Sequence, residues 1–165
     1  MSAADTRVDA NAGGLGRLLG AAEARLAWLG MLAAPLFLRV AVAIPFFRSG
    51  LTKWDGLSLS PSAIYLFENE FKLHFLGAVH DFPLPVAAAF ASATGEIVLP
   101  ILLVIGLATR FAALGIILMT LVIQLVVPGG WLTYHLPWGA MALALMALGP
   151  GVLSLDRLIA RRIAG

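Results

Sequence analysis

The sequence predicts an all-α integral membrane protein that folds as an antiparallel four-helix bundle. Of its 165 residues, 61% are hydrophobic and 12% are charged, whereas soluble domains average about 45–50% apolar and about 25% charged residues. The mean hydropathy is +0.95. Four apolar stretches qualify by length, since a helix needs roughly 20 residues to cross a bilayer core of about 30 Å.

Each predicted span is an apolar run with few charges. The runs do not alternate polar and apolar residues, as the strands of a membrane barrel do. Turn-forming residues separate them, among them Pro128-Gly129-Gly130. The predicted spans are 26–51, which contains Arg39 and Arg48; 86–107, whose one charge is Glu96; and the uncharged runs 111–127 and 136–153.

Three regions follow from this pattern. Residues 1–25 form a cytoplasmic leader that we expect to be mostly disordered or amphipathic, and residues 26–153 form the transmembrane domain with an outer loop at 52–85. Residues 154–165 form a short basic cytoplasmic tail helix. The tail sets Leu155, Leu158 and Ile159 against Arg157, Arg161 and Arg162.

The outer loop contains a stretch, 64–76, with two competing patterns. Phenylalanines recur at helical spacing, while charged residues alternate with their neighbours as in a strand. We favour a helix that lies on the outer membrane surface.

Lysine and arginine near the span ends predict the orientation. The leader, the turn at Arg110 and the tail together carry seven arginines, and the opposite side carries Lys53, Lys72 and Arg48. Both termini are therefore predicted to be cytoplasmic, in a bacterial inner membrane. The rings of Trp131, Tyr134 and Trp138 then form an aromatic belt at the outer interface.

Ionisable residues inside a membrane mark functional sites. Arg39 and Glu96 are each predicted to lie about 15 Å from a membrane edge, which puts them at the same depth. We therefore expect them to pair near the midplane. The pair is either a structural ion pair or a proton or ligand site, and both residues are candidates for catalysis.

A polar and aromatic pocket for a quinone head group is predicted in the outer half of the bundle. Its lining is expected to include Arg48, Gln124, His135 and Trp138, with Glu96 at its floor. Each of the first three also has a simpler interpretation. Arg48 can anchor to lipid headgroups, Gln124 can hydrogen-bond between helices, and His135 can sit at the interface.

Other classes of site are disfavoured. The chain has no cysteine, so it forms no disulfide, thiol relay or iron–sulfur cluster of its own. A formal net charge of +2 is too small for a nucleic-acid surface. No metal site is predicted, because His74 and His80-Asp81 in a loop are a weak pattern. The expected partners are the lipid bilayer, another protein and a further copy of the chain.

Three runs resemble the DoxX family, which consists of small four-helix membrane proteins. The run 37–56 ends in Gly50-x-x-Lys53, the run 93–116 contains Glu96 and a Gly-Leu-x-Thr-Arg turn, and the run 149–159 is similar to the glycine-rich close of that family. The resemblance implies that Arg39, Lys53 and Glu96 occupy signature positions. Segment 67–71 and the start of the fourth span look like a subgroup encoded beside metal-dependent enzymes that modify small secreted peptides.

The resemblance implies several functions. The family includes membrane subunits of thiosulfate:quinone oxidoreductase and members associated with redox-defence complexes. We therefore expect an accessory membrane subunit of an oxidoreductase system, linked to quinone. The alternatives are a non-enzymatic membrane anchor or assembly partner for metal-handling or peptide-modifying enzymes, and a small transporter. Without cysteine, electrons for any quinone reduction must come from a partner.

Overall fold

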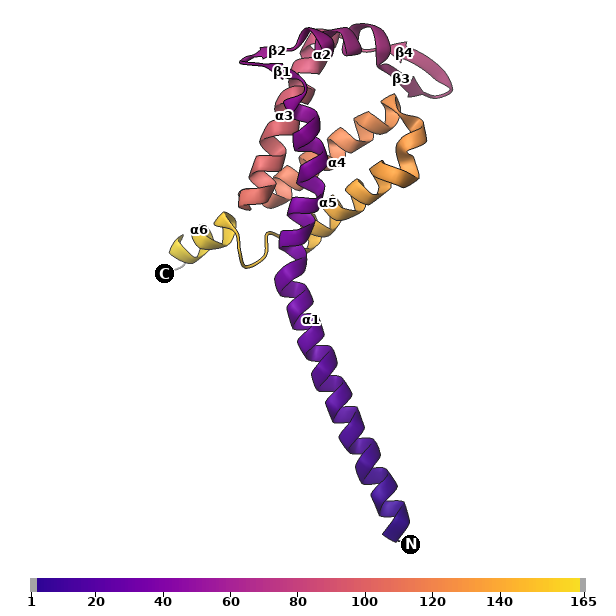
Figure 1. The fold of residues 1–165 in the computed structure, drawn as a ribbon, viewed down its shortest axis with the longest axis vertical. Helices are drawn as coiled ribbons and strands as arrows, with labels where there is room; N and C mark the ends of the chain where they lie inside the picture. The colour runs from indigo at the N-terminus through magenta and orange to yellow at the C-terminus, as the bar shows by residue number, and fades with distance from the viewer. Residues whose placement is uncertain (1–2, 164–165) are drawn as a thin grey trace. The chain divides into compact units, whose positions relative to one another are not determined.

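The computed structural model describes the backbone of residues 3–163 and the side chains of residues 16–163 (Figure 1). The chain divides into two units, residues 1–34 and 35–165, and each is described by itself. The long helices are α1 (Ala3–Leu51), α3 (Pro85–Ile105), α4 (Thr109–Val126) and α5 (Leu136–Leu148). The short elements are α2 (Pro61–Tyr65), π-helical turns at Leu66–Glu70 and Trp131–His135, a 3-10 turn at Pro128–Gly130 and α6 (Leu155–Ile163).

The N-terminal unit consists of the first part of α1. The leader was expected to be mostly disordered or amphipathic, and the structure describes it as helical from Ala3 onward. Residues 1–2 of the leader lie outside the described residues. Apolar side chains such as Leu26, Trp28 and Met31 are exposed on this part of the helix. They belong to an apolar stretch that we expect lipid to cover.

Within residues 3–163, three helices are long and apolar enough to cross a membrane: Gly16–Leu51, Pro85–Ile105 and Thr109–Val126. The second and third agree closely with the spans predicted at 86–107 and 111–127. In the most apolar window of each helix only 28% of the residues are buried inside the protein, so most of these side chains need an apolar surrounding outside it. The protein is therefore a helical membrane protein.

α5 is shorter than the fourth span predicted at 136–153. Its helix ends at Leu148, because Gly149 takes φ +78° and the segment Gly149-Pro150-Gly151 cannot continue it. A π-helical turn, Trp131–His135, precedes α5 directly and extends the helical run toward the N-terminus.

One hydrophobic core joins four helices of the second unit. Its buried members are Val42 and Phe46 of α1, Leu103 of α3, Ala112, Ala113 and Ile116 of α4, and Ala142 and Leu145 of α5. Lipid tails are as apolar as the helix surfaces, so the hydrophobic effect does not drive these helices together. The small residues of the core instead let the helices approach closely and pack against one another. α3 and α4 meet at their joining turn and diverge from it toward the outer loop (Figure 1).

The chain is mostly helical, as predicted, and the strands of its described residues lie in the outer loop. The loop contains two antiparallel hairpins, β1 (Trp54–Asp55) with β2 (Ser58–Leu59), and β3 (Lys72–Phe75) with β4 (Ala78–Asp81). The favoured helix over 64–76 is therefore correct only as far as Glu70. From Lys72 the alternating pattern prevails, and Leu76 and Gly77 close the hairpin with φ +51° and +78°.

Gly50 permits a close approach between α1 and α3. A Cβ atom at Gly50 would lie 2.9 Å from the Cβ and the carbonyl carbon of Glu96. We therefore expect Gly50→Ala to lower the free energy of unfolding by about 1–3 kcal/mol through overpacking. Thermal melting in detergent measures this, and Gly139→Ala is the matched control because nothing lies within 4 Å of a Cβ there. Equal melting temperatures for the two variants would show that this contact is unimportant.

Candidate functional site

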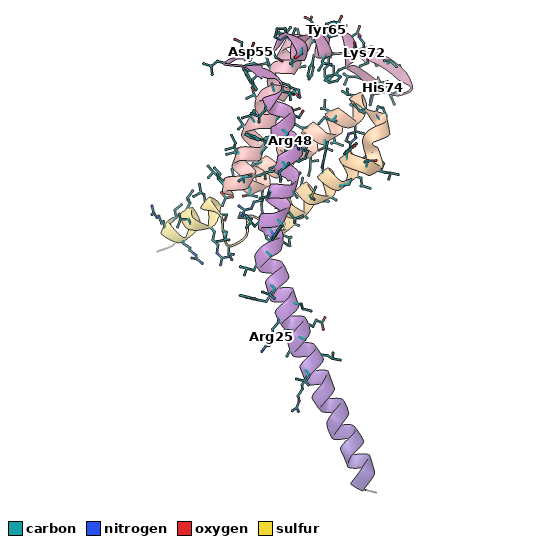
Figure 2. All side chains as sticks on the ribbon, viewed as in Figure 1. Arg25, Arg48, Asp55, Tyr65, Lys72 and His74 are labelled. Atoms are coloured by element: carbon teal, nitrogen blue, oxygen red, sulfur yellow. The ribbon has the colours of Figure 1, made fainter. Side chains whose placement is uncertain are left out.

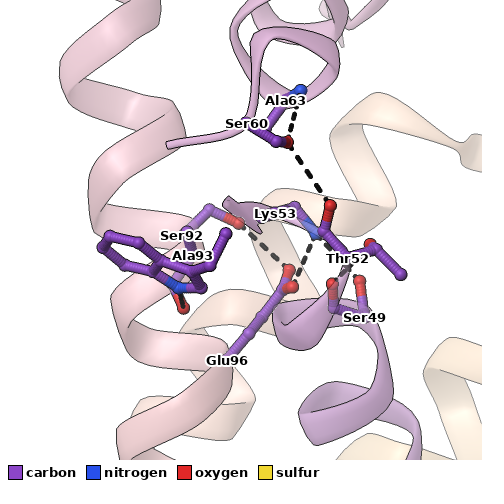
Figure 3. A network of polar contacts seen from close by, with 9 residues as sticks. Ser49, Thr52, Lys53, Ser60, Ala63, Ser92, Ala93 and Glu96 are labelled. Atoms are coloured by element: carbon purple, nitrogen blue, oxygen red, sulfur yellow. Dashed lines mark hydrogen bonds and ion pairs between the residues drawn. The ribbon is translucent and has the colours of Figure 1, made fainter. Parts of the chain in front are cut away.

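A buried ion pair between Lys53 and Glu96 is the centre of the site (Figure 3). The Lys53 Nζ lies 2.6 Å from Glu96 Oε2, and the two residues are only 8% and 4% exposed. Lys53 Nζ also donates to Ser49 Oγ at 2.9 Å, and Ser92 Oγ donates to the second carboxylate oxygen, Oε1, at 3.1 Å. Each charge thus has a second polar partner, as a buried pair requires to offset desolvation.

The backbone around Lys53 holds its side chain in place. Lys53 follows the end of α1, and its N–H donates to Gly50 O at 3.0 Å, while its carbonyl accepts from Ser60 N at 2.9 Å. Next along the chain, Trp54 Nε1 donates to Ala93 O of α3 at 3.3 Å. The hydroxyl of Ser60 accepts from Ala63 N and caps α2. The lysine is therefore presented by a rigid turn rather than by a free loop.

The predicted pairing of Arg39 with Glu96 is wrong. Arg39 Nε donates to Pro35 O at 3.2 Å, and its NH2 group donates to Leu153 O at 2.6 Å. Glu96 packs level with Gly50 of α1, which lies about 16 Å further along the helix than Arg39. The depth estimate failed because it counted from span edges that hydropathy alone cannot locate to within a helical turn.

Arg39 belongs instead to a second polar cluster at the turn between α3 and α4. There Asp156, the second residue of α6, accepts from the N–H groups of Ala108 and Thr109 at 2.7 and 2.9 Å, and its own N–H donates to Gly106 O at 2.9 Å. Partial burial opposes ionisation of this carboxyl. The hydrogen bonds from Thr109 and Ala108 nevertheless hold the pKa of Asp156 below its usual range.

A cavity of about 540 Å³ adjoins the ion pair. Lys53, Glu96, Ser49 and Ser92 form its polar end, and the remaining lining is apolar. Its other lining residues are Pro45, Phe46 and Trp138, Phe67, Phe71 and Phe82 of the outer loop, Ala88 and Ala91 of α3, and Leu118, Met119, Val122, Ile123, Val126 and Val127 at or near α4.

The outer loop covers one side of this cavity. The ring of Phe67 stacks edge-on against Phe71 at 5.1 Å and lies 5.2 Å from the ring of Phe82. Further along the loop, His74 Nδ1 lies 3.1 Å from Leu125 O of α4. The loop thus spans from the end of α1 to α4 and bridges the helices that diverge beneath it.

The structure separates the residues predicted to line the pocket. Glu96 and Trp138 do line the cavity. Gln124 and His135 form a hydrogen bond to each other through Oε1 and Nδ1, and Gln124 Nε2 also donates to Pro128 O at 3.1 Å. Arg48 is exposed on α1 (Figure 2). Neither Gln124, His135 nor Arg48 is among the cavity residues.

Sequence reasoning did not find the partners of Glu96. The residue pattern used Lys53 to predict orientation, and its importance came only from the family resemblance. A usable signal was present, because Ser92 stands four residues before Glu96 and Ser49 four before Lys53. On a helix this spacing puts a hydroxyl directly beside a charge.

These features define a helical membrane protein with a buried ion pair at the polar end of an apolar cavity. A family model described as DoxX matches residues 34–129, more than half of the chain, and the chain belongs to the DoxX family. The matched range contains both Lys53 and Glu96. No curated protein sequence and no solved structure gives a significant match.

The ion pair makes a specific energetic prediction. Lys53→Met or Glu96→Leu alone leaves a buried charge without its partner and should lower the free energy of unfolding by about 3–5 kcal/mol. The double variant should lose much less than the sum. Thermal melting of the two single variants and the double variant in detergent gives the coupling free energy between Lys53 and Glu96.

The matched control pairs Glu96→Leu with Arg39→Met. These two residues share no hydrogen-bond partner, so their effects should add to within about 0.5 kcal/mol. Additive losses for Lys53 with Glu96, or coupling for Arg39 with Glu96, would contradict the assignment.

Proposed function

We propose that this protein is an accessory membrane subunit of an oxidoreductase system, and that a quinone-type carrier binds in the cavity beside Lys53 and Glu96. The observation that supports the proposal is the buried ion pair at one end of an otherwise apolar cavity. Ligand pockets in proteins have this composition, with apolar walls and a few fixed polar groups, at volumes of about 300–1,000 Å³.

Lys53 is suited to hold the carbonyl oxygen of such a carrier. An ammonium group has three N–H donors. Glu96 and Ser49 accept two of them, which leaves the third for a ligand at the cavity lining. As the carrier accepts electrons, negative charge grows on its oxygens, and a positioned ammonium in a dry site stabilises that charge.

The walls and the mouth fit a lipid-soluble ligand. Phe67 of the outer loop and Trp138 of α5 offer ring surfaces to the cavity. Leu118 and Val122, which also line it, are 55% and 46% exposed on α4, so this wall continues onto a surface that the bilayer covers. A hydrophobic tail has a lateral way out between α3 and α4.

The role proposed is that of a subunit rather than a complete enzyme. The chain has no cysteine for a thiol relay or an iron–sulfur cluster of its own, so electrons for the carrier come from a partner. The hairpin of β3 and β4 exposes Phe75, Leu76 and Val79 at 55%, 88% and 61%. This exposure favours a protein contact at the loop, and with it the second candidate function, a membrane anchor or assembly partner for metal-handling or peptide-modifying enzymes.

We further propose the topology in which this function operates. The π-helical turn at Trp131–His135 and α5 together run from Trp131 to Leu148, long enough to serve as a fourth, antiparallel span of about 27 Å. Seven arginines at the leader, at Arg110 and in the tail orient both termini toward the cytoplasm of a bacterial inner membrane. The cavity then lies toward the outer side.

Quinone binding is testable through cavity filling, which leaves the ion pair intact. A short-chain ubiquinone should quench tryptophan fluorescence of the purified protein saturably, because Trp138 lines the cavity. Ala91→Leu puts a larger side chain into the cavity and should weaken quinone binding at least about tenfold. This corresponds to a loss of about 1.4 kcal/mol in binding free energy. Ala87→Leu is the matched control, since Ala87 lies one turn earlier on α3, is exposed and is not among the cavity residues.

Trp138→Phe should remove the saturable quenching while the melting temperature stays near that of the parent protein. Quenching that does not saturate, or equal weakening by Ala91→Leu and Ala87→Leu, would contradict the proposed site. Intact folding without quinone binding would favour the anchor or assembly role.

A further inference from the structure

The tail helix α6 has an apolar face that nothing in the described part of the chain covers. Leu158, Ile159 and Ile163 are 49%, 45% and 81% exposed, and Leu155 is 39% exposed. These residues lie on one side of a nine-residue helix. Val152 and Leu153, just before the helix, are also exposed and extend the apolar surface.

The start of α6 is fixed at the level where two spans end. The N–H of Asp156 donates to Gly106 O, and its carboxylate accepts from the N–H groups of Ala108 and Thr109, where α4 begins. Leu153 O accepts from the buried guanidinium of Arg39. Because α3 ends and α4 begins at this turn, α6 starts at the depth of lipid headgroups, at the end of the helices away from the outer loop (Figure 1).

The charge of α6 complements an anionic surface. Asp156 is its one acidic residue, and its carboxylate is occupied by the backbone of α4. Arg157 and Arg161 lie on the side opposite the apolar face. Arg162 stands four residues after Leu158 and seven after Leu155, so it lies on the apolar side rather than opposite it, and its long side chain can reach outward to headgroup phosphates.

We infer that α6 docks its apolar face, with Arg162, into the headgroup region of a bilayer that contains anionic phospholipid. An amphipathic helix of this composition lies in the plane of the interface, where apolar burial and attraction to anionic lipid act together. The docked helix holds Asp156 on α4 and Leu153 on Arg39. The membrane surface therefore stabilises the polar cluster at the α3–α4 turn, in addition to the contacts of Asp156 with α4 and of Leu153 with Arg39. This inference is independent of any ligand in the cavity.

The test uses the full chain, which has no native cysteine. A single cysteine at Ile159→Cys carries an environment-sensitive fluorophore, and Ala160→Cys, about 100° further around the helix, is the matched control. Each protein is reconstituted in phosphatidylcholine vesicles with or without phosphatidylglycerol. Nitroxide-labelled lipid and aqueous iodide then report whether the label is in the interface or in water.

With phosphatidylglycerol present, the Ile159→Cys label should be quenched by nitroxide lipid and protected from iodide, and the Ala160→Cys label should behave in the opposite way. Arg162→Gln should reduce the docked fraction, with a docking constant about fivefold lower. Equal iodide access at the two labels would overturn the inference. The inference would also be overturned if protection of the Ile159→Cys label from iodide increased with the protein density in the vesicles and not with phosphatidylglycerol. A second copy of the chain would then cover the apolar face.

Discussion

The ion pair between Lys53 and Glu96 is the interaction on which the end of the helices next to the 52–85 loop depends. A carboxylate in the middle of a membrane-capable helix is stable only if a counter-charge and hydrogen bonds compensate for the water it has lost. Here the counter-charge comes from the turn that leaves α1, and Ser49 and Ser92 complete the shell. The same interaction fastens the first residues of the outer loop to α3. It therefore positions both the outer loop, which covers one side of the cavity, and the polar end of the cavity.

A different interaction organises the opposite end of the helices. Arg39, buried in α1, donates to the carbonyl of Leu153, and Asp156 caps the start of α4. The two intramembrane charges that the sequence made conspicuous, Arg39 and Glu96, thus serve separate clusters about three helical turns apart. An apolar core of four helices lies between them. The cluster of Arg39 and Asp156 therefore holds the tail, and the cluster of Lys53 and Glu96 lies beside the cavity.

Hydropathy was sufficient for the parts of the fold that lipid determines. The helices α3 and α4 begin and end within a few residues of the predicted spans, because length and apolar content are direct requirements of the bilayer. Helix rotation and vertical offset are set by packing, as at Gly50 against Glu96. One sequence does not contain these quantities, and the pairing of Arg39 with Glu96 failed for that reason. Gln124 and His135, which were predicted to line the pocket, form a hydrogen bond to each other and are not among the cavity residues.

Nitrogen NMR of the lysine side chains tests directly whether the free donor of Lys53 faces the ligand. The chain has two lysines, Lys53 and Lys72, and Lys72 pairs with Asp81 on the exposed hairpin. Protein labelled with ¹⁵N-lysine therefore gives two side-chain signals, which Lys72→Gln assigns. On addition of a short-chain ubiquinone, we expect a saturable shift of the Lys53 Nζ signal and an unchanged Lys72 signal. A Lys53 signal that stays in place while the quinone binds would contradict this placement of the donor.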